Sequence, residues 1–517
     1  MKNVWRKTAE RPLWTFVASW LGIFILSGSW AVATPMGGSP DEPAHIIKAA
    51  AVAHGQLLGE PTSKPAELRV TVPTDVATAA TWPCYAFDPT RTAACVVDAV
   101  TDASGLSKAT TSAGLYNPVY YALVGWPSLL AESPKVAVLG MRLVSALISS
   151  FFLAVALTVL LQFRRPFMAS ATFVAAATPM VFFLNSAVNP NSLEITAGAA
   201  LLTLLLWVTI GPRPDEHLRM ALVLIGVSGA LLFNARGISP VWVALIAAAV
   251  LIATPGARLA ALFRRWEIWA CLAVLLAGVG FALAWVLSSG TLNNMGNFPG
   301  AGATTPTQAF ILMLLDRSFD PGLIGVFGWL DTWSPAFTYV LWSALGAGVG
   351  IVALTMIRGR LLVAYIVMAL GLFIGPPLIQ ALSVENSGYI WQGRYTLVAY
   401  VCFILLSGVG MMLAPRSHAI TATRPVAVTL FWAFGALVAI GQVWALAVTI
   451  KRYAVGVNGT WTSLLLNPQW HPPVGVLPWL ALALLGQGLI LAVLYAALNT
   501  GAHRETESVE LASAVRS

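Results

Sequence analysis

The sequence is short of charged residues and of cysteine. Only 10% of its 517 residues are Asp, Glu, Lys or Arg, 4 are cysteines, and 58% are hydrophobic. A soluble protein of this length carries roughly a quarter charged residues, so the composition excludes a soluble globular protein. The sequence contains no Walker or dinucleotide-type glycine motif and no basic patch interleaved with aromatic residues. It therefore predicts neither a nucleotide-binding loop nor nucleic-acid binding.

Long apolar runs take the place of the missing charge. The mean hydropathy is +0.78, and apolar runs of about 20 residues recur, each long enough to cross a bilayer as a helix. We therefore expect an all-α polytopic membrane protein with about twelve transmembrane helices. The expected spans are residues 13–33, 136–162, 167–184, 192–211, 219–234, 238–254, 268–289, 335–357, 361–382, 395–414, 426–449 and 475–498. The third, fifth and sixth are short, which is typical of re-entrant or strongly tilted segments.

Basic residues predict the orientation of these spans. Residues 1–12 are basic, and the loops on the same side of the predicted bundle contain Arg164, Arg165, Arg213, Arg219, Arg258, Arg264, Arg265, Arg358, Arg360, Arg416 and Arg424. The positive-inside rule makes these loops cytoplasmic, with both termini, in the plasma membrane. The polar tail, residues 499–517, is expected to be cytoplasmic and disordered. The net charge of +8 thus reflects topology.

The same assignment of alternate loops to the two sides of the membrane predicts a large extracytoplasmic loop at residues 34–135. This loop is expected to contain short helices and to precede a transmembrane domain of residues 136–498. The further outer loops of that domain are expected at residues 290–334, 383–394 and 450–474.

The cysteines divide between two environments. Cys84 and Cys95 lie in the large outer loop, where oxidation is permitted, whereas Cys271 and Cys402 lie in apolar spans. We expect a disulfide between Cys84 and Cys95. The alternative is two free thiols in a reducing compartment.

The stretch "SPDEPAH" directly after the first span places three ionisable residues together. Ser39 is a natural N-cap with Glu42 at the capping-box position, which would give Glu42 a structural role. Asp41 would also be favoured by the helix dipole. His45, however, lies four residues after Asp41 and shares its helix face. An acid and an imidazole on one face suit proton abstraction from a hydroxyl group, or binding of a divalent cation or phosphate.

Other outer segments supply polar residues at a similar depth. Asn189 and Asn191 belong to a predicted turn and helix cap, and Glu194 begins an apolar span, where an ionisable group is costly unless it faces a cavity. Arg236, Arg317 and Arg394 each adjoin an apolar span. Anionic lipid headgroups would account for each arginine singly. Three on one surface with Asp41 favour a phosphate-binding cleft, because the planar guanidinium suits phosphate oxygens.

Four motifs together carry a resemblance to a known family. The "PDEPAH" after the first span, the "LYNPVYY" before the second, the "NPNSLEITAG" turn and the late "WQGRY" resemble the DUF2142 family of bacterial polytopic membrane proteins. That family looks like a branch of the GT-C membrane glycosyltransferases, and the resemblance covers about residues 13 to 450. It implies a GT-C-like fold.

The resemblance also implies roles for individual residues. Asp41 would activate the acceptor hydroxyl, with Glu42 and His45 as further catalytic candidates. Arg394, within "QGRY", would bind the donor phosphate, with Arg236 and Arg317 as further candidates. The residues expected to contact the substrates are Tyr116, Asn117, Asn189, Asn191, Glu194, Asp331, Trp391, Gln392 and Tyr395. GT-C enzymes differ in their need for a divalent metal, so Mg²⁺ or Mn²⁺ is an optional cofactor here.

The chemistry required outside the cell fits this residue set. No nucleotide sugar is present there, so a glycosyl donor must arrive on a polyprenyl phosphate, held among membrane lipids. Transfer to a glycan or lipid-linked acceptor needs a base and cationic stabilisation of the departing phosphate. The basic pI and the abundance of Ala, Val and Gly suggest a bacterial source. In an actinobacterium, arabinose or mannose would be plausible sugars for a cell-envelope polysaccharide, as in an arabinofuranosyltransferase.

Two other functions compete with this one. A transporter or lipid flippase would place ionisable residues or broken helices near the middle of the bilayer, ideally with repeat symmetry. Few ionisable residues lie in the middle of the spans, and polar groups gather at their outer ends, which favours surface chemistry. A non-catalytic envelope-assembly protein would not require Asp41 or Arg394.

Overall fold

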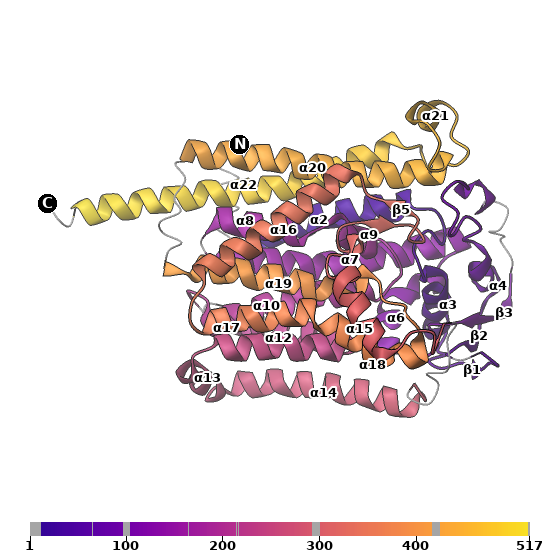
Figure 1. Cartoon of the computed structure of the whole chain (residues 1–517), viewed down its shortest axis with the longest axis horizontal. Helices are drawn as coiled ribbons and strands as arrows, with labels where there is room; N and C mark the ends of the chain where they lie inside the picture. The colour runs from indigo at the N-terminus through magenta and orange to yellow at the C-terminus, as the bar shows by residue number, and fades with distance from the viewer. Residues whose placement is uncertain are drawn as a thin grey trace.

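The structure is a computed structural model. It describes residues 12–64, 66–96, 104–163, 165–213, 215, 217–291, 300–415 and 424–514. Residues 1–11 of the predicted cytoplasmic segment 1–12 lie outside these residues, as do Arg164 and Arg416. Figure 1 shows long helices side by side, with their axes roughly along the longest axis of the molecule.

Nine helices in the described part of the chain are long and apolar enough to cross a membrane. They are α2 (Pro12–Ala33), α7 (Pro134–Gln162), α10 (Asn191–Ile210), α14 (Trp266–Ser288), α16 (Ala336–Met356), α17 (Arg360–Phe373) continued by α18 (Gly375–Ser387), α19 (Gly393–Leu413), α20 (Arg424–Val455) and α22 (Leu477–Ala514). Each overlaps a predicted span.

The remaining predicted spans are short or broken. Helices α8 (Pro166–Ala176) and α9 (Pro179–Asn185) meet at 64°, and α12 (Ser239–Ala253) and α13 (Gly256–Phe263) meet at 112°. Both bends lie beside a proline, which cannot continue the backbone hydrogen-bond ladder. Helix α11 (Leu218–Phe233) has 16 residues. The third, fifth and sixth predicted spans are therefore the irregular ones, as their lengths indicated.

The helices differ in how far the protein itself buries them. The apolar windows of α10 and α19 are 89% buried, whereas that of α14 is 6% buried. Helices α10 and α19 pack on each other at the centre, and α14 packs on α11 at the edge. A helix that is apolar on all sides but covered on only one suits a lipid-facing position. The central position of α10 and α19 gives the residues at their ends a rigid support.

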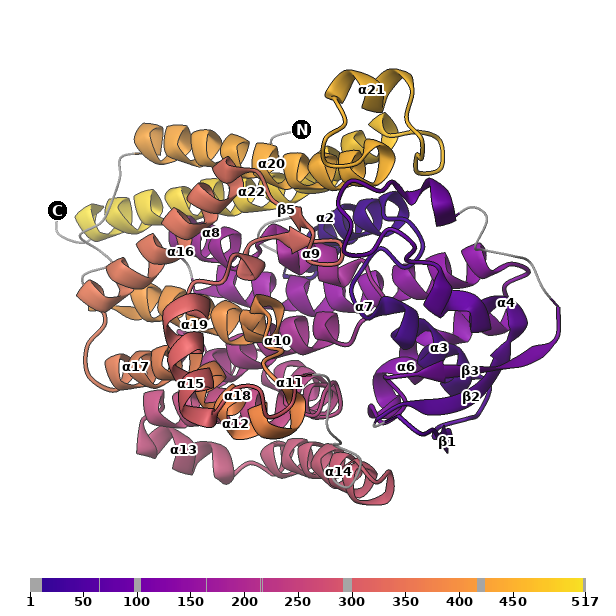
Figure 2. The same cartoon turned by 45° about the vertical axis from the view of Figure 1, so that its right-hand side comes forward.

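Most of the non-membrane structure gathers at one end of the bundle, which we call the loop end (Figure 1). Residues 34–133 form α3 (Glu42–Ala53), β1 (Glu60–Pro61), β2 (Leu68–Pro73), α4 (Thr74–Ala77), β3 (Leu106–Thr111) and α6 (Pro118–Gly125). Strands β1, β2 and β3 form an antiparallel sheet in that order, and α3 packs on β2, β3 and α6 (Figure 2). The sheet was not predicted, because only short helices were expected in this loop.

Further short elements complete the loop end. They are α15 (Pro306–Leu312), the hairpin of β4 (Val326–Phe327) and β5 (Thr332–Trp333), and α21 (Trp461–Leu466). At the opposite end, Arg258 and Arg265 pair with Asp215, so two of the basic loops lie together there. Helix α22 extends beyond the predicted span of residues 475–498, as far as Ala514.

Candidate active site

Helix α3 begins at Glu42, and Asp41 occupies the N-cap position. The backbone of Asp41 is left-handed, with φ of 64°, and its side chain makes no capping hydrogen bond. The predicted capping box of Ser39 and Glu42 is therefore wrong. The capping box does not form because the carboxylate of Glu42 binds a charged side chain instead of the backbone of the first turn. Aspartate and asparagine tolerate the left-handed region better than most residues, which suits the aspartate here.

The partner of Glu42 is Arg142 of α7. Arg142 donates from Nε and Nη2 to the two carboxylate oxygens, at 2.7 and 2.6 Å. The backbone N–H of Val188 donates to the same carboxylate at 3.1 Å. The side chains of Arg142 and Glu42 are 3% and 0% exposed. This geometry favours a structural role for Glu42, although it was also proposed as a catalytic candidate.

Asp41 itself pairs with Arg394 at the start of α19. Nη2 of Arg394 donates to Oδ2 of Asp41 at 2.5 Å, and Nη1 donates to the carbonyl oxygen of Pro40 at 3.3 Å. The Arg394 side chain is 1% exposed, whereas that of Asp41 is 51% exposed. The Nε atom of Arg394 is buried without a hydrogen-bond partner. A fixed, partly unsatisfied guanidinium thus lies beside a carboxylate that solvent can reach.

Arg236 and Arg394 both lie near the ring of Tyr395. The guanidinium carbons of Arg236 and Arg394 are 4.7 and 5.2 Å from the centroid of the Tyr395 ring. Arg236 also donates to Glu194 at 3.0 Å, and Ser239 donates to the other oxygen of Glu194 at 2.7 Å. Glu194 at the start of α10 therefore has a counter-ion, which explains how it is tolerated at the end of an apolar span.

His45 lies one helical turn after Asp41, beside two tyrosines. Its Nδ1 is 2.7 Å from the hydroxyl of Tyr121, and its ring packs against Tyr116 with centroids 5.4 Å apart. Burial lowers the pKa of His45 to about 4, and the positive charges of Arg394 and Arg236 act in the same direction against the opposing effect of Asp41. His45 is therefore neutral at physiological pH. No direct hydrogen bond joins it to Asp41 among the described contacts.

Opposing effects act on the Asp41 carboxyl group. Burial raises its pKa, but the charge of Arg394, that of His45 in its protonated form, a hydrogen bond from Arg394 and the charge of Arg236 together bring the pKa below its ordinary value. Burial has the largest effect on this group, although half of the side chain reaches solvent. Asp41 is therefore ionised and accessible to a ligand.

Several of the residues predicted to contact the substrates have structural partners. Asn117 caps α6 through Val119 and donates to Asn234 at 2.7 Å. Asn189 accepts from the backbone of Asn191, as its predicted turn required. Among these predicted substrate contacts, two side-chain oxygen atoms are buried without a hydrogen-bond partner: Oδ1 of Asn191 and Oε1 of Gln392. Trp391, next to Gln392, donates from its indole to Thr396.

Arg317 and Asp331 have their ion-pair partners elsewhere. Arg317 pairs with Asp320 at 2.8 Å. Asp331 accepts from Arg452 at the loop end of α20, at 2.6 Å, and its side chain is only 6% exposed. The structure thus brings Asp41, His45, Arg236, Arg394 and Tyr395 together, whereas Asp331 belongs to a second, buried ion pair.

The segment between α2 and α3, residues 34–41, is held by side chains from distant parts of the chain. We call it the α2–α3 linker. Tyr85, Trp329 and Tyr453 donate to the carbonyl oxygens of Met36, Gly37 and Gly38, at 3.0, 2.9 and 2.6 Å. Arg142 donates to those of Thr34 and Pro35, at 2.7 and 2.8 Å. Consecutive carbonyls from Thr34 to Gly38 therefore have fixed partners, and Asp41 stands at the end of a clamped backbone.

We call these five carbonyl groups and their donors, Arg142, Tyr85, Trp329 and Tyr453, the clamp. The disulfide lies beside it. Cys84 and Cys95 are bonded, with their Cα atoms 6.3 Å apart, which confirms the prediction. Arg452 donates to the carbonyl oxygens of Tyr85, Asp88 and Arg91 within the disulfide loop. Cys271 and Cys402 are free and buried, as expected of cysteines in apolar spans.

The sequence argument missed Arg142, Arg452 and the three aromatic donors of the clamp. Arg142 and Arg452 did carry a signal, because each is an ionisable residue inside an apolar helix, where a charge usually marks a specific partner. The aromatic donors carried none, since tyrosine and tryptophan are common at membrane surfaces. Within the described ranges no three His, Cys, Asp or Glu side chains lie close enough to hold a metal ion. The optional divalent cation stays a prediction.

Fold and site together define a polytopic membrane protein with an acid–arginine site at one end of its helix bundle. Residues 24–404 match the family model described as "Predicted membrane protein (DUF2142)". The chain belongs to this family, as the motif resemblance indicated. Comparison with curated proteins found no match.

Two solved structures are similar to the chain. One is a crystal structure of ArnT from Cupriavidus metallidurans bound to undecaprenyl phosphate, with 13% identity, a TM-score of 0.42, and coverage of 96% of this chain and 79% of that one. The other is ArnT from the same organism in the apo state, with 15% identity, a TM-score of 0.42, and coverage of 96% and 78%.

Proposed function

We propose that the protein is a membrane glycosyltransferase of the GT-C type, which transfers a sugar from a polyprenyl-phosphate donor to a glycan or glycoconjugate. The observation that carries the proposal is the pairing of a solvent-accessible carboxylate, Asp41, with a buried arginine, Arg394, that keeps one N–H unused. The loop end would face the extracytoplasmic side, because the predicted basic loops lie at the opposite end of the bundle. No nucleotide sugar is available there, so the donor would be lipid-linked.

In this mechanism Asp41 accepts the proton of an acceptor hydroxyl group. The hydroxyl oxygen forms a bond to the anomeric carbon as the bond from that carbon to the phosphate oxygen breaks. Polyprenyl phosphate leaves with the electron pair, and its negative charge is stabilised by Arg394 and Arg236. Phosphate is a good leaving group, so no second carboxylic acid is needed to protonate it.

The ion pair also suggests an order of events. Arg394 donates a hydrogen bond to Asp41, and this contact helps to lower the pKa of Asp41. A donor phosphate would compete for the same guanidinium and would weaken its hold on Asp41. The pKa of Asp41 would then rise towards that of a more effective base. In this proposal, donor binding prepares the base before the acceptor reacts.

The experiment is transfer of sugar from a synthetic prenyl-phosphate sugar to a glycan acceptor by the protein in nanodiscs. Asp41→Asn is the informative variant, because asparagine also tolerates the left-handed backbone of this position. Wild-type protein should transfer the sugar, and Asp41→Asn should lower the rate about 10²–10⁴-fold. Wild-type rates in a stably folded variant would favour the envelope-assembly alternative.

A further inference from the structure

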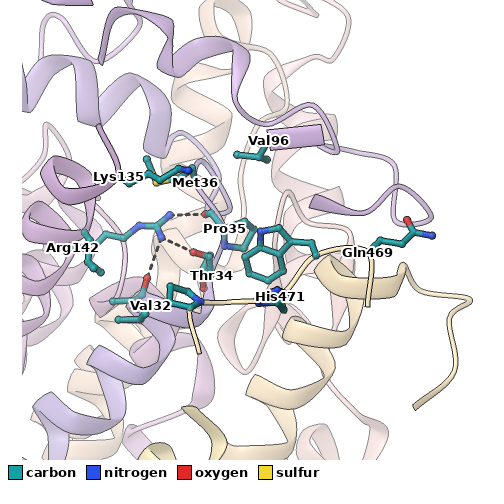
Figure 3. A pocket seen from close by; sticks show the side chains of 13 residues that line it. Val32, Thr34, Pro35, Met36, Val96, Lys135, Arg142, Gln469 and His471 are labelled. Atoms are coloured by element: carbon teal, nitrogen blue, oxygen red, sulfur yellow. Dashed lines mark hydrogen bonds between the residues drawn. The ribbon is translucent and has the colours of Figure 1, made fainter. Parts of the chain in front are cut away.

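A cavity lies at the loop end, apart from the acid–arginine site. Its volume is about 410 Å³, within the range of small-molecule sites. The end of α2 and the α2–α3 linker form one side, the first turns of α7 a second, and residues 469–473 a third (Figure 3). None of its lining residues is Asp41, His45, Arg236 or Arg394. Arg142 lines the cavity and holds Glu42, so this ion pair separates the cavity from the proposed active site.

The ionisable side chains that line the cavity are all basic. They are Lys135, Arg142 and His471, and no carboxylate is among the lining residues. The Arg142 guanidinium is fully used by Glu42 and by backbone carbonyl groups, as Figure 3 shows for the carbonyls. Lys135 is exposed and is the second residue of the 29-residue helix α7. The positive end of that helix dipole therefore adds to the charge of Lys135, and the cavity suits an anion.

The remaining walls of the cavity are mainly apolar. Val32 and Leu139 come from the ends of two membrane helices, and Trp470 comes from the segment that connects α21 to α22. Trp461 and Trp479 stand near the two ends of that segment. Tryptophans gather where membrane helices meet the aqueous interface, so the cavity opens at the depth of lipid headgroups. A ligand here would need one anionic end and one hydrocarbon end.

We propose that the cavity binds an anionic glycerophospholipid. Lys135 and His471 contact its phosphate group, and the first methylene groups of its chains pack against Val32 and Leu139. Because Thr34, Pro35 and Met36 also line the cavity, a bound lipid supports the α2–α3 linker. The lipid is distinct from the polyprenyl-phosphate donor, since Asp41, Arg236 and Arg394 are not among the residues that line the cavity.

The test is native mass spectrometry of the full-length protein with dioleoylphosphatidylglycerol or dioleoylphosphatidylcholine added at equal concentration. Wild-type protein should retain the anionic lipid in preference, by about fivefold from the charge of Lys135. The variant Lys135→Gln/His471→Gln should lose this preference. Lys108→Gln removes an exposed lysine elsewhere at the loop end and should keep it. Equal retention of the two lipids by wild type, or an unchanged preference in the double variant, would overturn the proposal.

Two further experiments test whether the lipid binds in this cavity and whether it is a glycerophospholipid. Leu139→Trp fills the cavity without changing charge, so it should reduce retention of phosphatidylglycerol while the protein stays folded. Retention at the wild-type level would show that lipid binds elsewhere. Competition with a polyprenyl phosphate should leave the phosphatidylglycerol adduct in place. Displacement from wild type at equimolar concentration would overturn the assignment of the occupant as a glycerophospholipid.

Discussion

At the scale of single residues, Glu42 and Asp41 are adjacent in sequence but differ in environment. Glu42 is fully buried and accepts three hydrogen bonds, whereas the carboxylate of Asp41 is half exposed. The sequence could not separate these roles, because Arg142 lies 100 residues away from Glu42. It did identify Asp41, His45 and Arg394 as candidates for one site, since each lies where an apolar span ends.

Glu42→Gln should mainly affect stability. It leaves the buried guanidinium of Arg142 without a counter-charge, which typically costs about 3–5 kcal/mol. The measurement is thermal unfolding in detergent, and the unfolding temperature of the variant should lie well below that of the wild type. The control is Glu60→Gln, whose exposed pair with Lys108 should change stability by less than about 1 kcal/mol. A variant of wild-type stability that has lost transfer activity would instead assign Glu42 to catalysis.

His45 should make the protein sensitive to acid. Its folded pKa is about 4, against an ordinary value of 6.5, so the unfolded chain binds more protons between these pH values. The stability from neutral His45 is fully present above pH 6.5 and decreases as the pH falls towards 4, by up to about 1.4 kcal/mol per pH unit. His45→Gln should flatten this part of the pH profile of thermal unfolding. His54→Gln, exposed just beyond the same helix, should not, and equal slopes in all three proteins would contradict the prediction.

At the scale of elements, the α2–α3 linker is positioned by parts of the chain that lie far apart in sequence. Its partners belong to α7, the disulfide loop, the β4–β5 hairpin and α20. The disulfide and the helix after the linker were predictable from local patterns. The clamp and the three-stranded sheet were not, because their contacts join segments whose approach depends on how the helices pack.

Tyr453→Phe tests whether the clamp positions Asp41. The change removes the hydrogen bond to Gly38 and leaves a buried carbonyl without its donor, at a cost of about 1–3 kcal/mol. We expect kcat to fall, with the affinity for donor nearly unchanged, because the base moves while Arg394 stays. Tyr365→Phe is the matched control, since its hydroxyl donates to Gly350 within the bundle, away from the linker. An equal loss of activity in the two variants would show a general effect of stability.

At the scale of the whole molecule, all twelve predicted spans correspond to helices, helix pairs or the shorter α11 in the described chain. Hydropathy predicts such elements well because the bilayer fixes the length of apolar helices. It does not predict which helices lie at the centre, since α14 and α19 are similarly apolar. Burial separates them, and the site residue Arg394 lies on the buried one.

The orientation of the bundle is testable by cysteine labelling. Ser63→Cys and Glu385→Cys lie at exposed positions towards the loop end, and Asp215→Cys lies at the opposite end. The loop-end cysteines should react with a membrane-impermeant maleimide on intact cells, and Asp215→Cys should react only after lysis. The reverse pattern would place Asp41 in the cytoplasm and remove the reason for a lipid-linked donor.

The most direct measurement separates donor binding from turnover in two variants of the ion pair. Asp41→Asn should bind a prenyl-phosphate sugar with nearly wild-type affinity but should transfer it about 10²–10⁴-fold more slowly. Arg394→Lys keeps the charge but loses the planar fork, so its main effect should be weaker donor binding. Donor affinity and single-turnover rate in nanodiscs measure the two effects independently. Wild-type turnover by a stably folded Asp41→Asn variant would contradict the role of Asp41 as the base.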